Sequence, residues 1–360
     1  MTTRRILGAP RRYIQGPGVI GELRGLVAEL GQRAFLVADP VAWENEGAKM
    51  KPWLDGAEVG MFGGEITAAE IDRLAARAAR TGADCVIAFG GGKAIDAAKS
   101  VALQHRLPII VVPSVASNDA PTSRLIVVYD QSHRIAELRR LAANPDIVLA
   151  DTEIIARAPR RFLAAGIGDA LSKLFEANAC HAAGGLNFFG ARPPLAAIAL
   201  ARCCHDTIRR DGLAALRAVD AKTPDAALEN TVEACILMIG VGFESGGLSL
   251  AHALTRGFTA HPATTRALHG EIVAFGTIAQ LVQQEHPDAE IRDLVRFCKA
   301  CGLPTNFAAL GLASPSEADL AAIAEPTLAA PYIGNLREPP DRARLIAVLR
   351  RCDELGGAAP

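Results

Sequence analysis

Short apolar runs and amphipathic stretches alternate over the first 150 residues of the chain. Residues 22–30 and 70–81 have apolar positions at helical spacing. Five runs have the length of buried strands and are rich in aliphatic residues: residues 33–39, 84–89, 107–112, 124–129 and 146–150. Because parallel strands need crossover connections that are usually helices, this alternation predicts an α/β region with a largely parallel sheet.

After about residue 154 the strand-like runs stop, and alanine-rich apolar segments of helical character replace them. Residues 232–282 form a near-continuous apolar stretch that is interrupted by a polar segment with a proline at residues 261–266. This pattern predicts two antiparallel helices packed on most sides. We therefore expect an α/β nucleotide-binding domain over residues 1–153 and an all-helical domain over residues 154–360.

Composition and charge exclude several classes of protein. A chain of 360 residues, half of them hydrophobic and 21% charged, is typical of a two-domain globular enzyme. The formal net charge of −1 offers no general attraction to nucleic acid or to an anionic membrane. We see neither a secretory signal nor an uncharged run of the roughly 20 residues that a membrane span needs. We expect a cytoplasmic protein without nucleic-acid or membrane partners.

Cysteine spacing points to buried thiols. The chain has eight cysteines, of which Cys298 and Cys301 form a CxxC without a second pair. A disulfide framework is improbable in so large a chain. We interpret these residues as buried thiols and not as a zinc or redox site.

Two histidines lie in the two apolar helices predicted within residues 232–282. His252 is flanked by alanines, and His269 follows the polar turn. A buried imidazole nitrogen without a partner costs about 1–3 kcal/mol, so each ring needs one. A single such histidine is more often a satisfied core residue, but two on facing helices favour a shared metal ion.

Asp169 is the candidate carboxylate for the same metal. It follows Gly166 and Gly168 and precedes an alternation of helical type. The alternative interpretation is a helix N-cap, where aspartate is favoured. One aspartate and two histidines make a set that binds a divalent metal with coordination positions left open, as a catalytic zinc requires.

A glycine run that follows the strand predicted at residues 84–89 is the candidate cofactor site. The segment GGGKAIDAAK starts at residue 90, so a strand, a glycine turn and a helix occur in the order that binds phosphate. The cofactor contacts expected there are Gly91, Gly92, Lys93, Ala94, Ile95 and Asp96. The GxGxxG match at residues 16–21 is interpreted as a loop, because the preceding RRYIQ is a poor buried strand.

Asp39 ends the strand predicted at residues 33–39. An acid at this position can accept hydrogen bonds from the adenosine ribose and repels a 2′-phosphate. This favours NAD over NADP as the cofactor, although aspartate is also common in turns after strands.

The motifs GIGDAL, GFESGGLSLAHAL and HGEIVAFGT, together with GGGKAIDAAK and PSVASNDAPTS, resemble the glycerol dehydrogenases of the metal-dependent (iron-type) alcohol dehydrogenase superfamily. The resemblance covers almost the whole chain and implies the dehydroquinate synthase-like fold, a homo-oligomer and NAD. It also implies one zinc ion per subunit, held by Asp169, His252 and His269. Lys173 stands where the iron-dependent branch has a further histidine, which argues for the three-ligand zinc type.

The resemblance also implies further contacts to cofactor and substrate. Asp119 matches an acceptor for a substrate hydroxyl, although its own context would suggest an Asx-turn. The other implied cofactor contacts lie in PSVASNDAPTS and the following strand: Ser114, Val115, Ala116, Ser117, Ser123, Leu125, Val127 and Tyr129.

The implied reaction is NAD-dependent oxidation of glycerol or a related small polyol to the hydroxyketone, with hydride transfer from an alkoxide on the zinc ion. Asn118, Arg124 and Gly334 depart from the glycerol dehydrogenase pattern, and Lys173 offers a partner for a substrate carboxylate. One alternative is therefore a hydroxycarboxylate or cyclic-polyol dehydrogenase on the same fold. The other is a metal-dependent lyase or synthase with bound NAD, although the metal-bearing half lacks the clustered basic residues that a phosphorylated substrate needs.

Overall fold

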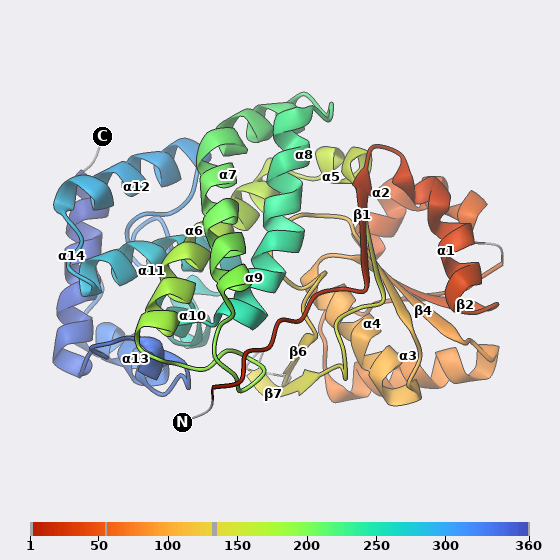
Figure 1. Ribbon diagram of the computed structural model, residues 1–360, viewed down its shortest axis with the longest axis horizontal. Coiled ribbons are helices and arrows are strands. Elements are labelled where there is room, and N and C mark those ends of the chain that lie inside the picture. The colour runs from red at the N-terminus through yellow and green to blue at the C-terminus, as the bar shows by residue number, and fades with distance from the viewer. Residues whose placement is uncertain (1–2, 55, 132–134, 359–360) are drawn as a thin grey trace. The chain divides into compact units, whose positions relative to one another are not determined.

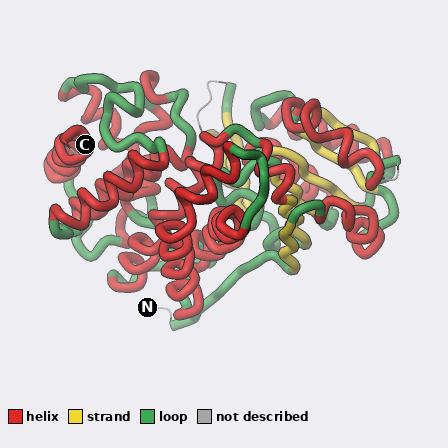
Figure 2. Tube along the Cα trace, turned by 90° about the horizontal axis from the view of Figure 1, so that it is seen from above, coloured by secondary structure: helices red, strands yellow, loops and turns green. Residues whose placement is uncertain are grey.

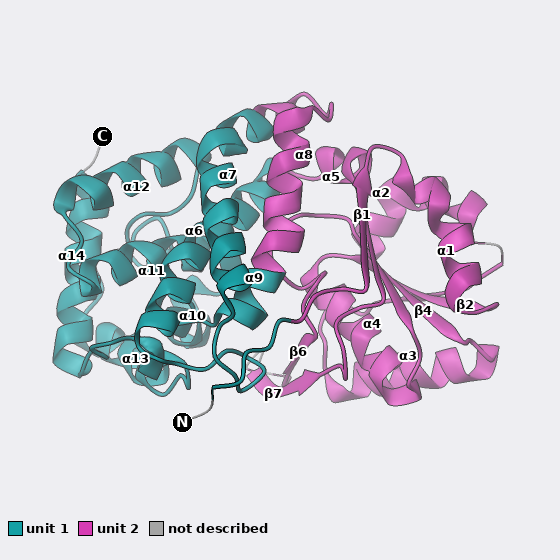
Figure 3. Cartoon of the chain, in the orientation of Figure 1, with its two compact units in different colours: residues 1–7, 160–216, 241–360 teal, residues 8–159, 217–240 magenta. Residues whose placement is uncertain are grey.

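The computed structural model describes residues 3–54, 56–131 and 135–358 (Figure 1). Its strands cluster in one part of the molecule, and the remainder is helical (Figure 2). Contacts divide the chain into two compact units (Figure 3). Unit 1 comprises residues 1–7, 160–216 and 241–360, and unit 2 comprises residues 8–159 and 217–240. A division at residue 153, as predicted, would differ from this one at residues 1–7, 154–159 and 217–240.

Unit 2 is built on a six-stranded sheet in which every neighbouring pair of strands is parallel. The strand order is β1-β8-β5-β4-β2-β3. The strands are β1 (Arg12–Gly16), β2 (Ala34–Ala38), β3 (Glu58–Met61), β4 (Cys85–Gly90), β5 (Ile109–Pro113) and β8 (Ile147–Asp151). All residues of the four inner strands are buried, which explains their continuous apolar runs.

Helices cover both faces of this sheet. In Figure 1, α1 and α2 lie on one face, and α3 and α4 lie on the other. Leu36 and Ile87 of the sheet pack with Leu23 and Met50 in the core beneath α1 and α2. The helices of unit 2 are α1 (Leu23–Leu30), α2 (Pro40–Met50), α3 (Ala68–Thr81), α4 (Gly92–His105), α5 (Thr152–Arg157) and α8 (Ala226–Glu233). The predicted parallel α/β class is confirmed.

Three strands, β1, β3 and β7 (Ile135–Arg140), lack the continuous apolar runs from which the other strands were predicted. The edge strands β1 and β3 are mostly half-exposed or exposed, and β7 is almost entirely exposed. β6 (Leu125–Tyr129), which we predicted beside the parallel strands, pairs with β7 as a separate antiparallel hairpin.

Unit 1 is helical, as predicted for the C-terminal part of the chain. Its helix α6 packs against α11, and α10 packs against both α11 and α13. The helices are α6 (Arg160–Ala182), α7 (Leu195–Asp220, which continues into unit 2), α9 (Ile239–Gly246, which begins in unit 2), α10 (Leu250–Ala260), α11 (His269–Gln283), α12 (Asp288–Cys301), α13 (Glu317–Leu328) and α14 (Arg342–Ala358). A π-helical turn at Ala234–Met238 joins α8 to α9.

The helix that runs through Ala226–Gly246 is long and apolar enough to cross a membrane by composition. However, 67% of its most apolar window is buried inside the protein, which is typical of a core helix. Its composition is therefore weak evidence for a membrane span.

Two glycines allow α6 and α11 to approach closely. A Cβ atom on Gly270 would overlap the carbonyl oxygen of Ala165, and one on Gly168 would overlap the carbonyl oxygen of Gly270. Both obstacles are backbone atoms, so only glycine permits this separation of the two helices. Because Asp169 follows Gly168 and His269 precedes Gly270, the crossing brings these two side chains together.

Candidate metal and cofactor sites

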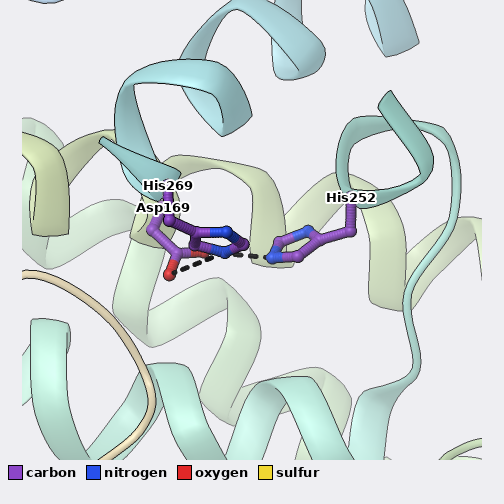
Figure 4. Close-up of side chains that lie close together, drawn as sticks. All are labelled: Asp169, His252 and His269. Atoms are coloured by element: carbon purple, nitrogen blue, oxygen red, sulfur yellow. Dashed lines mark ion pairs between the residues drawn. The ribbon is translucent and has the colours of Figure 1, made fainter. Parts of the chain in front are cut away.

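Asp169, His252 and His269 meet in unit 1, with their side chains directed toward one another (Figure 4). One potential ligand atom from each residue lies within 4.8 Å of the other two. Asp169 Oδ1 is 3.2 Å from His252 Nε2, and Asp169 Oδ2 is 3.7 Å from His269 Nε2. Ligand atoms on a tetrahedral zinc ion are about 3.4 Å apart, so the cluster fits a divalent cation.

Asp169 is a buried carboxylate in the interior of α6. The helix begins at Arg160, so the alternative of an N-cap is wrong. Within the described residues, neither of its oxygens accepts a hydrogen bond of good geometry, although Lys173 Nζ is 2.9 Å from Oδ1. Burial raises the pKa of Asp169, but the charges of Lys173 and the imidazoles outweigh it and hold the pKa well below its usual range. The group is therefore an anion that a cation would stabilise.

Glu176 orients His252 and was missed by the sequence analysis. Its Oε2 is 2.5 Å from His252 Nδ1, while its Oε1 accepts the backbone N–H groups of Ser249 and His252 at 2.9 and 3.0 Å. With Nδ1–H donating to Glu176, Nε2 is the nitrogen that faces Asp169 and can hold a cation. Burial lowers the pKa of His252, but Glu176 and Asp169 raise it overall, which makes the ring a stronger base.

A signal for Glu176 was present in the sequence. It lies seven positions after Asp169, so both residues occupy the same face of one helix. A second carboxylate on an apolar helical face, two turns from a candidate ligand, points to the same site.

We expect Glu176→Gln to weaken metal binding by about 10–100-fold, because a neutral amide neither holds the Nδ1 proton nor increases the basicity of the ring. Competition with a chromophoric chelator measures the affinity for zinc. Glu46→Gln is the matched control, because Glu46 is a buried glutamate of α2 in unit 2 that pairs with Arg157. Equal affinity in Glu176→Gln and the unmodified protein would rule out this role for Glu176.

His269 lies on the accessible side of the cluster. It is the first residue of α11, and its side chain is 40% exposed, whereas Asp169 and His252 are buried. Its ring centroid is 5.3 Å from that of His252. A cation bound by the three residues would have room for further ligands on the side of His269, as a catalytic metal needs.

The predicted cofactor residues of unit 2 gather at the carboxyl ends of its parallel strands. Gly90 ends β4 with a φ of 150°, and Gly91 is the N-cap of α4. The Gly90 carbonyl accepts the backbone N–H of Ser114, at 3.0 Å, so the loop after β5 lies against the glycine turn. A Cβ atom on Gly90 would be 2.6 Å from the Cβ of Asp39, which places the end of β2 beside them. Nucleotides bind parallel sheets at this edge.

Two of these residues also have partners within the protein. Asp39 Oδ1 caps α2 by accepting the backbone N–H of Ala42 at 2.9 Å. Lys93 Nζ is 2.7 Å from Glu65 Oε2 and lies 5.0 Å from the ring centroid of Tyr129. Cofactor contacts of Asp39 and Lys93 stay predictions.

Asp96 is positioned to hold the β6–β7 hairpin on α4. Its Oδ1 accepts from Lys99 Nζ at 3.1 Å, and its Oδ2 accepts the backbone N–H of Val127 at 2.9 Å. Lys99 Nζ also donates to the carbonyl oxygen of Leu125. Both carboxylate oxygens of Asp96 thus accept hydrogen bonds within the protein, and a contact between Asp96 and the cofactor stays a prediction.

The remaining predicted residues surround the glycine turn or line β6. Asp119 is half-buried, and its carbonyl oxygen accepts from the N–H groups of Thr122 and Ser123. The Asx-turn belongs to Asn118, whose Oδ1 accepts from Ala120 N at 3.1 Å. Five of the remaining predicted cofactor residues are buried: Ala94, Ile95, Ser114, Ala116 and Ser123. Seven are half-buried: Gly91, Gly92, Val115, Ser117, Leu125, Val127 and Tyr129.

The GxGxxG segment at residues 16–21 is closed by a carboxylate of the protein. The backbone N–H groups of Gly18 and Ile20 donate to Asp151, at 3.3 and 3.0 Å. A bound phosphate would need these same N–H groups as donors. Because they already donate to Asp151, we interpret the segment as a structural loop.

Cys298 and Cys301 are free, buried thiols of α12, as predicted. Burial raises the pKa of Cys301 to about 12, which keeps this thiol protonated and unreactive.

A hollow of about 710 Å³ opens elsewhere in unit 2. Its lining includes Arg24, Trp53 and the first residues of β2 and β3, Ala34 and Glu58. It therefore lies at the amino ends of the strands, at the opposite edge of the sheet from the glycine turn, and is separate from the candidate cofactor site.

Comparison with known proteins identifies the family. Residues 10–152 match the sequence profile described as iron-containing alcohol dehydrogenase. A glycerol dehydrogenase of Thermotoga maritima is 42% identical over 319 residues, which are 88% of this chain and 87% of that protein. A glycolaldehyde reductase of Halobacterium salinarum is 39% identical over 89% of each chain. The crystal structure of a probable glycerol dehydrogenase from Sinorhizobium meliloti 1021 is 36% identical, with a TM-score of 0.93 over 99% of this chain and 100% of that one.

These findings define the class, because the chain has the fold of the iron-containing alcohol dehydrogenases. Within this class, the chain belongs to the glycerol dehydrogenase family. The resemblance and the fold class stated from the sequence are both confirmed.

Proposed function

We propose that the protein oxidises glycerol, or a closely related small polyol, with NAD as the hydride acceptor. The observation that carries the proposal is the Asp169, His252 and His269 cluster in a chain 42% identical to a glycerol dehydrogenase. One carboxylate and two imidazoles suit zinc. The metal would supply a Lewis acid that polarises the substrate hydroxyl and lowers its pKa.

The residues of the chain hold this chemistry in place. Glu176 fixes the His252 tautomer that turns Nε2 toward the cluster, and Asp169 stays anionic. In unit 2, backbone N–H groups at the start of α4 would hold the pyrophosphate of NAD. Oxidation removes a hydride from the carbinol carbon and a proton from its hydroxyl, giving the hydroxyketone, NADH and a proton that water accepts. Asp119 would accept a hydrogen bond from a further substrate hydroxyl.

The metal content, the oligomeric state and the cellular compartment follow from the resemblance to glycerol dehydrogenases and from the sequence. We expect one zinc ion per subunit and a homo-oligomeric enzyme of the cytoplasm.

The position of Lys173 favours a neutral polyol over a hydroxycarboxylate. Its side chain is fully buried, and its ammonium faces Asp169 and His252. A substrate carboxylate would have to displace one of these residues to reach it.

NADH formation with a panel of alcohols tests the proposed function. The zinc-loaded protein should reduce NAD⁺ with glycerol or another vicinal diol, and a chelator should stop the reaction. Turnover of a 2-hydroxycarboxylate alone, or the absence of NADH with every alcohol, would contradict the proposal.

We expect kcat/KM to be higher with NAD than with NADP, because Asp39 would accept hydrogen bonds from the ribose and repel a 2′-phosphate. Asp39→Ser separates this role from helix capping, because serine still caps α2 but carries no charge. The substitution should raise the NADP to NAD ratio of kcat/KM by about tenfold or more. If the unmodified protein uses both cofactors equally, the assignment of Asp39 is wrong.

A further inference from the structure

Lys173 is a fully buried lysine, one helical turn after Asp169 on α6. Its Nζ atom is 2.9 Å from Asp169 Oδ1 and 3.0 Å from His252 Nε2. The ring of Phe243 flanks the same ammonium, with its centroid 5.7 Å away. The ammonium therefore contacts two of the three groups that are expected to hold the metal.

Lys173 and a metal ion would use the same atoms. In the neutral form of His252 that can hold a metal, Nδ1–H donates to Glu176 and the lone pair of Nε2 faces Lys173 Nζ, 3.0 Å away. A zinc ion would bind this same lone pair, at about 2.1 Å. An ammonium that stays 3.0 Å from Nε2 would then lie within a few ångströms of the metal, where like charges repel strongly in buried surroundings.

The charges around the cluster lead to the same conclusion. Asp169 and Glu176 are buried carboxylates in contact with His252, and their two negative charges equal the charge of a divalent cation in magnitude. Lys173 adds a positive charge beside the atoms that would hold that cation. Either the ammonium moves when the metal binds, or it remains and repels the metal.

We propose that Lys173 is a built-in competitor of the metal ion. Its ammonium holds Asp169 and His252 in their ligand positions before the metal binds, and it lowers the affinity of the site for a divalent metal. The metal in this chain is therefore more readily exchanged than in a site with a neutral residue at this position. The inference rests on the proposed function, because it takes Asp169, His252 and His269 as the metal site.

Lys173→Met tests the proposal through zinc affinity and thermal unfolding, neither of which depends on activity. Chelator competition should show zinc binding at least about tenfold tighter than in the unmodified protein, because the charge repulsion is removed. The metal-stripped variant should unfold at a lower temperature than the stripped unmodified protein. Zinc should then raise its unfolding temperature by more than it does for the unmodified protein.

Lys99→Met is the matched control. Lys99 is another fully buried lysine, and it pairs with an aspartate on its own helix, Asp96, at 3.1 Å in unit 2. This variant should lose stability and keep the zinc affinity of the unmodified protein. Lys173→Thr is the second neutral variant and decides the question in the same assays if the methionine variant does not fold.

The outcomes separate the two proposals. If neither the unmodified protein nor the Lys173 variants bind zinc at this site, the proposed metal site itself falls. If the unmodified protein binds zinc and the neutral Lys173 variants bind it equally or more weakly, the competitor role is overturned. Tighter binding in either folded Lys173 variant, with unchanged binding in Lys99→Met, supports it.

Discussion

Replacing Asp169, His252 or His269 by alanine should each abolish polyol oxidation, with a loss of about a thousandfold or more in kcat. Each residue supplies one of the ligand atoms that lie within 4.8 Å of one another, so each loss leaves an incomplete site. Zinc occupancy should fall in all three variants. NAD binding should persist, because the glycine turn and Asp39 belong to unit 2.

Metal analysis and NAD titration on the three variants check this expectation. Any two of the substitutions combined should add little further loss, as expected for groups that act as a unit. His261→Ala is the matched control, because His261 follows α10 and pairs with Asp319 outside the cluster. Full activity or unchanged zinc in one of the three variants would remove that residue from the site.

Gly270→Ala should destabilise the protein by about 3 kcal/mol or more and should also impair zinc binding. The new Cβ would overlap the carbonyl group of Ala165, so α11 would have to move away from α6. His269 begins α11 and would move with it, away from Asp169. Thermal unfolding followed by circular dichroism and zinc titration measures both effects.

Gly25→Ala is the control for adding a methyl group to a helix. Beyond the adjacent residues and the backbone of α1 itself, no described heavy atom lies within 4 Å of a Cβ at Gly25, so this variant should gain about 0.5–1 kcal/mol of stability. A Gly270→Ala protein that unfolds at the same temperature and binds zinc with the same affinity would show that the helix crossing tolerates a side chain.

The strands that could be predicted are those with two buried faces. β2, β4, β5 and β8 read as continuous aliphatic runs because helices cover both faces of the sheet. β1 and β3 have only one neighbour each, and β7 is almost entirely exposed, so their sequences lack such runs. Their pairing depends on neighbouring strands that are distant in the sequence.

The candidate site could be predicted where residue type and setting both pointed to a ligand. His252 and His269 were identified because imidazoles in apolar helices need partners. Glu176 was not, because its partner His252 is 76 positions away and a lone glutamate in a helix is usually solvated. The position of Lys173 between Asp169 and His252 likewise depends on how two helices pack.

Neither unit is encoded by one continuous stretch of the gene. The chain passes from one unit to the other after residues 7, 159, 216 and 240. A fragment ending at residue 159 would lack the carbonyl of Ile236 that accepts from Thr122, and the Glu229 side chain that binds Gln15. Transplanting the cofactor-binding unit into another enzyme would therefore require residues 8–159 and 217–240 to be exchanged together, as two inserts in one recombinant.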